Sequence, residues 1–371
     1  MLRFASSPRT DVLCDQHRGR LHSDSVVSTS QADAWDSFVH AHPDGTIFHT
    51  QGWRNAVSDT FGHKPVYLSV QRGAHAHDAG KITGVLPLFE VRSLFLGRML
   101  VSVPYGVGGG LLTESYDTSA ALFDAACEVA RDRRCRGIDM RSEAAMLEDV
   151  PVTRGYVGFK KTLPDSVDDV LLSLPRKARA AARQARRKYE LTISYGARHL
   201  PDVYRLYAHS MRRLGSPNYP FRFFEALTQS FKNATWVALV RWQGTPVAGL
   251  VTFLFRDSVM PYFVGLSDKA RECHAANFIY LCTMERAVAR GFSCFDFGRS
   301  RTDNTGSYDF KRFQGFSPRP LGYQFHTLPG QRPVSLSASS GRFALARSLW
   351  KRCPVALTQS LGAKLSYHFP G

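Results

Sequence analysis

The sequence predicts a mixed α/β fold made of two similar units from an internal duplication, followed by a helical tail. Helical and strand patterns follow one another in the same order in both halves of the chain. Residues of the first half also recur in the second half at a constant offset of 157 residues. The matched pairs include Pro104 and Pro261, Tyr105 and Tyr262, Gly108 and Gly265, and Asp139 and Asp296. With 371 residues, of which 44% are hydrophobic, the chain is long enough to bury two cores.

The first unit is expected over residues 29–165, after a disordered leader at residues 1–28. The leader mixes Ser, His, Arg and Asp, and it lacks the apolar block of a signal peptide. Apolar residues at helical spacing and apolar runs between polar turns mark the elements of this unit. We expect, in order, helices at 34–39 and 51–61, strands at 65–71, 82–91 and 98–104, a helix at 119–134 and a strand at 137–140.

The second unit, expected over residues 166–329, repeats this order after a basic helix at 176–190. Hairpin-linked strands followed by a helix that crosses to a further strand give a mixed sheet with helices on both faces. We expect helices at 202–214 and 221–231, strands at 235–242, 247–255 and 259–265, a helix at 277–290 and a strand at 294–297. Residues 330–371 are expected to form a Ser-rich linker at 335–340 and a tail of two short helices at 343–353 and 355–365.

The chain is strongly basic, with a formal net charge of +17. The sharpest concentration of charge is the segment 176–188, in which Arg176, Arg179 and Arg183 recur at helical spacing. Like charges at this spacing destabilise a helix modestly, so an anionic partner such as tRNA would offset the repulsion. The alternatives are a solvated linker helix and a basic protein that has no polyanionic partner.

The segment 295–316 combines a short apolar strand with polar groups and a lysine. The strand ends at Gly298, a polar loop is expected through Gly306, and Phe310 and Lys311 follow. Loops that are held by rigid strands are where catalytic groups tend to lie. A partly desolvated ammonium can stabilise a developing oxyanion, which makes Lys311 the first catalytic candidate. The alternative is a lysine whose stem packs while its head reaches solvent.

The order of elements and the duplication resemble the tandem acetyltransferase-like (GNAT) folds of the FemAB-like family, over about residues 28–328. The segments that carry the resemblance are Phe295–Ser300, Gly306, Phe310–Lys311 and Gly315–Phe316. The tail, with Trp350–Pro354, resembles the branch of this family that accompanies exosortase XrtA and PEP-CTERM gene sets. The resemblance implies two tandem GNAT-like domains. It also implies transfer of an activated aminoacyl or acyl group to an amine, carried by a cell-envelope or exopolysaccharide precursor.

The resemblance also implies roles for individual residues. It associates Lys311 with the transfer step, and it places Tyr262 on the strand that carries the acyl-group channel. Arg212 resembles a position near the acceptor's phosphates, and the alternative is an interaction with the end of its own helix. Asp296 is expected either to serve catalysis or to pair with Arg299 or a backbone amide. The catalytic candidates are Lys311, Phe310 and Tyr262, and the substrate-binding candidates are Arg212, Arg299, Ser300, Arg176, Arg179 and Arg183.

No bound cofactor or metal is expected, because the histidines show no paired-ligand spacing. The activated donor, aminoacyl-tRNA or acyl-CoA, is expected as a co-substrate, and the acceptor as an amine on a nucleotide- or lipid-linked sugar. Relatives that use acetyl-CoA carry a glycine-containing turn that holds pyrophosphate, whereas residues 271–277 contain no glycine, which favours an aminoacyl donor. Two alternatives stay open: an acyl-CoA-dependent N-acetyltransferase acting on an amino sugar, and a non-catalytic polyanion-binding protein.

A cytoplasmic protein is expected. No apolar run is long enough to span a bilayer, and seven scattered cysteines without Cys-x-x-Cys spacing indicate reduced thiols. The tail places Trp350 beside basic residues, which would allow contact with an anionic surface at the inner face of the membrane. The alternative is a tail that docks on its own protein.

Overall fold

The computed structural model describes residues 25–28, 32–72, 80–332 and 344–371, so most of the expected leader and the Ser-rich segment 335–340 lie outside the described residues. The first half contains β1 (Ser25–Ser28), α1 (Ala32–Ala41), η1 (Ile47–His49), α2 (Gln51–Phe61), β2 (Lys64–Gln71), β3 (Ile82–Ser93), β4 (Gly97–Ser102), β5 (Leu112–Thr113), α3 (Tyr116–Asp132), β6 (Gly137–Arg141) and β7 (Tyr156–Thr162).

The second half contains α4 (Val167–Leu172), α5 (Arg176–Arg187), β8 (Thr192–Tyr195), η2 (Ala197–His199), α6 (Leu200–Leu214), α7 (Phe221–Ser230), β9 (Thr235–Trp242), β10 (Thr245–Phe255), β11 (Ser258–Leu266), η3 (Asp268–Ala270), α8 (Ala275–Ala289), β12 (Cys294–Arg301), α9 (Thr305–Phe313), β13 (Pro318–Pro320) and β14 (Tyr323–Thr327). The tail contains α10 (Ala344–Arg352), α11 (Val355–Leu365) and η5 (Ser366–His368). The expected order of helices and strands is confirmed, with ends that move by a few residues.

One expected element is wrong. The polar loop expected from Gly298 to Gly306 is instead the end of β12 followed by the start of helix α9. The strand continues because β7 pairs with it beyond Asp296, where Arg299 lies opposite Gly158. Lys311 therefore lies on a helix rather than after a loop.

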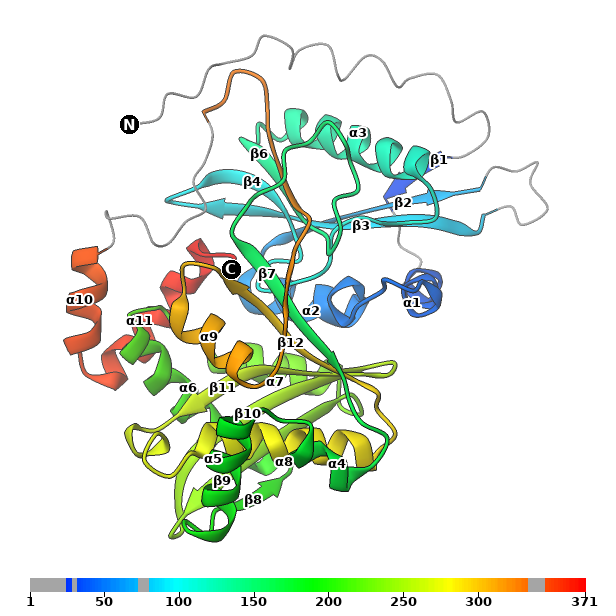
Figure 1. Cartoon of the computed structure of the whole chain (residues 1–371). Coiled ribbons are helices and arrows are strands. Elements are labelled where there is room, and N and C mark those ends of the chain that lie inside the picture. Colours follow the sequence, from blue (N-terminus) through cyan, green and yellow to red (C-terminus); the bar gives the residue numbers. More distant parts are fainter. Residues whose placement is uncertain (1–24, 29–31, 73–79, 333–343) are drawn as a thin grey trace.

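Two mixed sheets form the body of the molecule, and they exchange a strand. The first sheet has the order β1-β2-β3-β4-β6-β14, and the second has the order β13-β7-β12-β11-β10-β9-β8. Strand β7 is the last strand of the first unit in the chain but pairs with β12, and β14 is the last strand of the second unit but pairs with β6 (Figure 1). The expected division between residues 165 and 166 follows chain order, whereas each sheet takes a strand from across that division.

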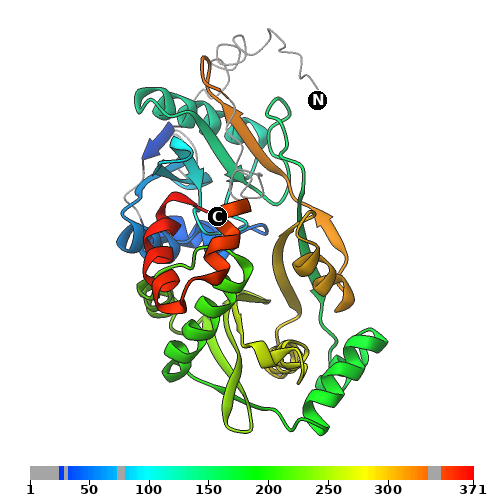
Figure 2. The same cartoon turned by 90° about the vertical axis from the view of Figure 1, so that its left-hand side faces the viewer.

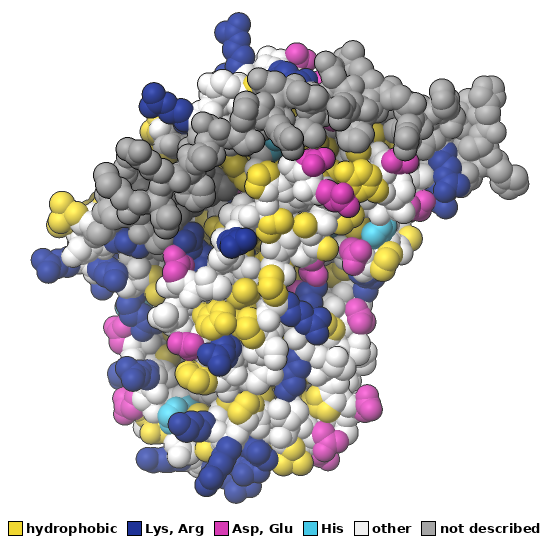
Figure 3. Space-filling model, turned by 45° about the horizontal axis from the view of Figure 1, so that its top comes forward, with side chains coloured by type: hydrophobic (Ala, Val, Ile, Leu, Met, Phe, Trp, Pro, Cys, Tyr) yellow, Lys and Arg dark blue, Asp and Glu magenta, His cyan; other side chains and the backbone are white. Residues whose placement is uncertain are grey.

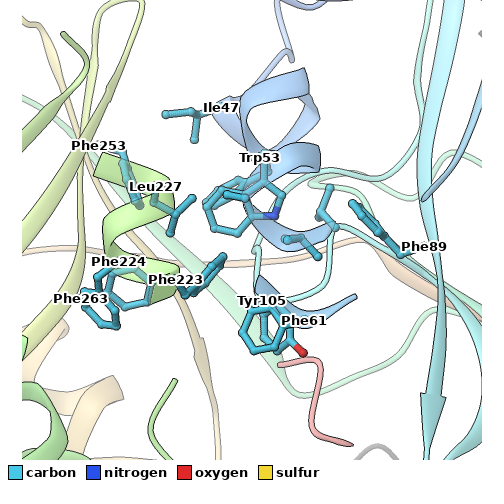
Figure 4. Packing of buried hydrophobic residues seen from close by; sticks show 14 of the residues in the cluster. Ile47, Trp53, Phe61, Phe89, Tyr105, Phe223, Phe224, Leu227, Phe253 and Phe263 are labelled. Carbon is cyan, nitrogen blue, oxygen red and sulfur yellow. The ribbon is translucent and has the colours of Figure 1, made fainter. Parts of the chain in front are cut away.

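Corresponding helices of the two units pack against each other between the sheets. Helix α2 carries Trp53 and Phe61 on its buried face, and α7 carries Phe223 on its own. The ring centres of Trp53 and Phe223 lie 5.8 Å apart, and the rings meet edge to face. Figure 4 shows these rings meeting in one hydrophobic cluster that both halves build. The two units therefore share a core and are not independent bodies joined by a linker.

In each sheet the central parallel strands pair over a short distance and then part. Strands β11 and β12 are paired at Ser258–Cys294 and Val259–Phe295, although both strands continue for several more residues. Strands β4 and β6 are likewise paired at Leu100–Ile138 and Val101–Asp139. Backbone groups beyond these points need other partners, so each parting is a natural place for a ligand or a side chain. We call the two partings the first wedge (β4 and β6) and the second wedge (β11 and β12).

The tail docks on its own protein. Arg212 Nη1, at the end of α6, donates to the carbonyl of Cys353 at 3.0 Å, and Asn218 Nδ2 donates to the carbonyl of Gln359 at 3.2 Å. Figure 2 shows the tail helices beside α6 and the end of the chain near the middle of the molecule. Among the described helices, none is long and apolar enough to cross a membrane.

Candidate active site

Lys311 lies on α9 with its ammonium turned toward the end of β12. Its Nζ donates to the carbonyl of Arg299 at 2.9 Å and to the carbonyl of Gly298 at 3.4 Å. Nζ also lies 5.3 Å from the centre of the Phe159 ring, on the exchanged strand β7. Only 9% of the residue is exposed, so the alternative of a solvated lysine head does not describe this side chain.

The buried position makes this ammonium easy to deprotonate. Burial lowers the pKa of Lys311 to about 7, while nearby Asp296 acts to raise it and Arg299 lowers it further. An ordinary lysine stays protonated at neutral pH, whereas here the two forms are comparably populated. The group can therefore donate hydrogen bonds as a cation and can also exchange its proton near neutral pH.

Asp296 holds the backbone at the point where β12 turns toward Lys311. Its Oδ1 accepts a 2.7 Å hydrogen bond from the amide of Gly298, and Gly298 has a φ of +64°, a conformation that favours glycine. Its Oδ2 lies 3.7 Å from Lys160 Nζ. Burial raises the pKa of Asp296, and Lys160 opposes that rise. Of the two structural partners expected for Asp296, the backbone amide is present, and the nearby cation is Lys160 rather than Arg299.

Lys160 and Glu143 belong to this site, and sequence reasoning missed both. Lys160 Nζ contacts a Glu143 carboxylate oxygen as well as Asp296. Burial alone would lower the pKa of Lys160, but Asp296 and Glu143 raise it above its ordinary value. Glu143, Lys160, Asp296 and Lys311 thus form a row of alternating charges. No local motif marks this row, because Lys160 reaches Asp296 only through the exchanged strand β7.

A group of tyrosines surrounds Arg299 where the two halves meet. The Arg299 guanidinium carbon lies 5.1 Å from the ring centre of Tyr156 and 5.7 Å from that of Tyr323. Tyr262 Oη donates to the carbonyl of Tyr105, and Tyr323 Oη donates to the carbonyl of Val107. Burial raises the pKa of Tyr262 well above its ordinary value, so this hydroxyl stays neutral. The hydroxyls of the second half therefore hold the segment that follows β4 in the first half.

Two of the expected site residues position α9 rather than face the row of charges. Ser300 is buried, and its Oγ lies 3.0 Å from Ser307 Oγ on α9. The centre of the Phe310 ring lies 5.6 Å from the ring centre of Tyr280 and 6.4 Å from that of Phe297. These contacts fix the helix against β12, which in turn fixes the direction of Lys311.

Arg212 does not join this group. Its guanidinium is directed at the tail and bonds the carbonyl of Cys353, as described above. The expectation that Arg212 faces an acceptor's phosphates is therefore not what this conformation shows. The physical reason is that the docked tail presents a main-chain carbonyl to this guanidinium.

The basic helix is confirmed as α5. Ala178, Ala182 and Ala185 are buried against the second unit. Arg186 pairs with Glu285 at 2.6 Å, whereas no ion pair is found for Arg176, Arg179 and Arg183 with any described residue. Figure 3 shows Lys and Arg side chains gathered at the lower end of the face that it presents.

The amino end of α5 lies close to the end of α9. A Cβ added at Gly315 would come within 3.0 Å of Pro175 Cδ, and Pro175 directly precedes α5. Gly315 in turn follows α9, which carries Lys311. The arginine face of α5 therefore begins near the helix of the candidate catalytic lysine.

The turn before α8 takes the shape that glycine usually provides. His274, at the start of α8, has a φ of +54°, and its Nε2 lies 3.1 Å from Gln184 Oε1 on α5. The absence of glycine from residues 271–277 therefore does not prevent a left-handed turn here. For metals, no group of three ligating side chains was found in the described ranges.

Residues 174–312 match the family model of the acetyltransferase (GNAT) domain. This part of the chain is similar to a GNAT acetyltransferase domain. It begins just before α5 and ends one residue after Lys311, so it contains the second wedge and the whole of β12. The expectation of a GNAT-type acyltransferase is thereby confirmed.

Solved structures confirm the tandem arrangement around this GNAT domain. FemX aligns with a TM-score of 0.62 at 14% identity, covering 82% of this chain and 97% of FemX. A tandem GNAT protein from the clavulanic acid biosynthesis pathway aligns with a TM-score of 0.51 at 12% identity, covering 82% of this chain and 98% of that chain. At such identities the likeness concerns the fold.

A third similar structure is the C-terminal domain of a putative lysylphosphatidylglycerol synthetase from Agrobacterium fabrum. It aligns with a TM-score of 0.51 at 12% identity, covering 81% of this chain and 92% of that chain. No curated protein matches the chain by sequence. The likeness again concerns the fold, which in this chain is a mixed α/β architecture with two sheets.

Proposed function

We propose that the protein transfers an activated aminoacyl or acyl group to an amine of a cell-envelope or exopolysaccharide precursor. The observation that supports this most directly is the buried ammonium of Lys311, held within the GNAT domain at the end of β12. Preorganised donors in a site that excludes water stabilise developing negative charge more strongly than donors in water do. Lys311 has such a position.

In the proposed reaction the neutral acceptor amine attacks the carbonyl carbon of the donor's ester or thioester. A tetrahedral oxyanion forms, and an N–H of Lys311 that is not used for the carbonyls of Gly298 and Arg299 stabilises it. The bond to the leaving oxygen or sulfur then breaks, the attacking nitrogen loses a proton, and the leaving group gains one. No covalent enzyme intermediate is required, and substrate groups relay the proton.

The arginine face of α5 supports a polyanionic donor, and we favour aminoacyl-tRNA. Three guanidiniums of α5 have no acidic partner in the described structure, and each would neutralise a phosphate of the donor. The helix that carries them begins near α9, the helix of Lys311. The second candidate is acyl-CoA with an amino sugar as acceptor, which the left-handed turn at His274 favours. Calorimetry with aminoacyl-tRNA and with acetyl-CoA distinguishes them, because binding of only one donor is expected.

The finer assignment rests on the resemblance of Phe310–Lys311 to the FemAB-like family and of the tail to the branch that accompanies exosortase XrtA and PEP-CTERM gene sets. It makes the acceptor a nucleotide- or lipid-linked sugar at the inner face of the membrane. Sedimentation of the protein with anionic liposomes tests that placement. The remaining alternative, a polyanion-binding protein without catalysis, predicts that a variant of Lys311 behaves like the unmodified protein.

The Lys311→Met variant tests the proposed function. We expect it to bind the donor normally and to lose transfer by about 10²–10³-fold, which is the usual effect of removing one oxyanion donor. The matched control is Lys269→Met, since Lys269 is an exposed lysine on η3. Unchanged turnover in Lys311→Met would contradict the proposed role of Lys311 in transfer.

A further inference from the structure

Residues 366–371, at the end of the tail, pack into the first unit. The amide of Tyr105 donates to the carbonyl of Pro370 at 2.7 Å, and Arg141 Nη1 donates to the same oxygen at 3.0 Å. Arg141 Nη2 donates to Gly371 O at 2.8 Å. The Arg141 side chain is 2% exposed and is also paired with Asp139 at 2.9 Å. A buried arginine of the first half thus donates hydrogen bonds from two of its nitrogens to main-chain oxygens of the tail.

The contacts continue upstream along the same segment. Ser93 Oγ donates to the carbonyl of His368 at 2.8 Å, and Tyr105 Oη donates to the carbonyl of Ser366 at 3.3 Å. The ring of Phe369 stacks on that of Phe95 with 5.0 Å between centres. Most of the polar contacts reach main-chain carbonyls, so the first unit holds this segment, which includes the 3-10 turn η5, chiefly through its backbone.

This segment fills the first wedge. Strands β4 and β6 part after Val101 and Asp139, and Tyr105 and Arg141 lie just beyond that point. Pro370 bonds to both of them, so it bridges the two sides of the parting. The wedge that corresponds to it in the second half is the one beside Lys311.

The filled wedge and the candidate active site share a wall. Tyr262 and Tyr323 of the active site donate to the carbonyls of Tyr105 and Val107, and the amide of Tyr105 holds the tail. Gly298, whose carbonyl receives Lys311, lies beside Val107, since a Cβ on Gly298 would be 3.9 Å from Val107 Cγ2. A change in the tail therefore reaches the backbone that lines the site.

We propose that residues 366–371 are an intramolecular ligand of the first wedge, and that their release opens the space between the halves to the acceptor. The resting protein is then self-inhibited. The same tail covers Arg212 through the carbonyl of Cys353, so release of the whole tail also frees that cation. The gating role rests on the proposed function, whereas the binding of the tail segment to the wedge does not.

The direct experiment uses a protein that lacks residues 366–371 and a synthetic peptide, Ser366–Gly371. The shortened protein should bind the peptide, and the full chain should not, because its own tail occupies the wedge. If the free peptide has a Kd of about 0.1 mM and the tethered tail an effective concentration of about 1 mM, shortening should raise turnover roughly tenfold. Added peptide should reverse that gain. A shortened protein that binds no peptide, or a full chain that binds it equally, would overturn the proposal.

A point variant of the full chain keeps the test valid if the shortened protein unfolds. Phe369→Ala removes the stacking on Phe95, so it should raise turnover without altering the core. The control is Leu361→Ala on α11, where Leu361 is 42% exposed and should leave turnover unchanged. Equal turnover in both variants would show that the tail is only a structural clamp. Peptide binding needs no substrate, so a failed transfer assay counts against the proposed function and not against the occupied wedge.

Discussion

At the scale of single residues, the protonation of Lys311 is set by a balance between burial and its charged neighbours. Burial removes water from the ammonium, Asp296 compensates in part, and Arg299 adds repulsion. The outcome is a lysine with a pKa of about 7 that still donates to two carbonyls. A cation of this kind is costly for folding, and that cost has a measurable dependence on pH.

The stability of the protein should report this cost. In the unfolded chain Lys311 has the ordinary pKa of 10.5, so between about pH 7 and pH 10 the unfolded state binds the extra proton. This contribution makes the free energy of unfolding rise with pH, by at most about 1.4 kcal/mol per pH unit. Lys311→Met lacks it, so its stability relative to the unmodified protein should decrease from pH 7 to pH 9 in urea titrations. Parallel curves for the two proteins would contradict the assignment of the low pKa.

Lys160 should tune Lys311 through Asp296. Lys160 opposes the raised pKa of Asp296, and Asp296 in turn acts to raise the pKa of Lys311. The pH at which transfer activity falls, which we expect above about pH 7, should therefore change in Lys160→Met. The matched control is Lys161→Met, because the neighbouring Lys161 instead donates to the carbonyl of Ser173 at 2.9 Å. An identical pH profile of transfer activity in both variants would show that Lys160 does not influence Lys311.

At the scale of elements, α5 offers a charge pattern that can be reversed without touching the core. Changing Arg176, Arg179 and Arg183 to Glu should weaken binding of a tRNA donor by several orders of magnitude at low salt and flatten its salt dependence. Thermal stability should change little, since the buried alanines of α5 remain. The control is reversal of Arg319 and Arg332, both exposed and outside α5. Equal losses of tRNA affinity in the two variants would show that the effect comes from the net charge of the protein and not from α5.

The sequence predicts the order of helices and strands well because the patterns that encode it are local. The buried face of α2 and the alternation along β11 are both legible within a few residues. The region after Gly298 is misread because its partner, β7, comes from the other half, and pairing with a distant strand leaves no periodic signal. Lys311 is identified by resemblance, whereas Lys160, Glu143 and Arg141 depend on contacts across the two halves.

At the scale of the whole molecule, the strand exchange makes the halves interdependent, and Gln324 on β14 is a sensitive point of that arrangement. Its buried Oε1 accepts from the amides of Met146 and Leu147 at 3.0 and 3.2 Å. Its Nε2 donates to the carbonyls of Leu147 and Val150. The side chain thus fastens β14 to a loop of the first half with all its hydrogen-bonding capacity used.

Gln324→Ala should therefore destabilise the protein by about 3 kcal/mol, because it leaves buried amides and carbonyls without partners. Chemical denaturation should show a single transition, since the shared core couples the two halves. Gln229→Ala, at an exposed position of α7, is the control and should change the free energy of unfolding by less than about 0.5 kcal/mol. Two separate transitions, or a small effect at Gln324, would contradict the interdependence of the halves.

The pairing of β6 with β14 has a consequence for synthesis on the ribosome. Strand β6 ends at Arg141, and its edge partner begins at Tyr323. At about 5–20 residues per second, that edge waits roughly 10–40 seconds for the strand that covers it. An uncovered strand edge is a template for pairing with other chains. The order of the strands therefore leaves this edge of the nascent first half exposed until β14 is made. Slowing translation between the two strands should lengthen that exposure and lower the yield of correctly assembled protein.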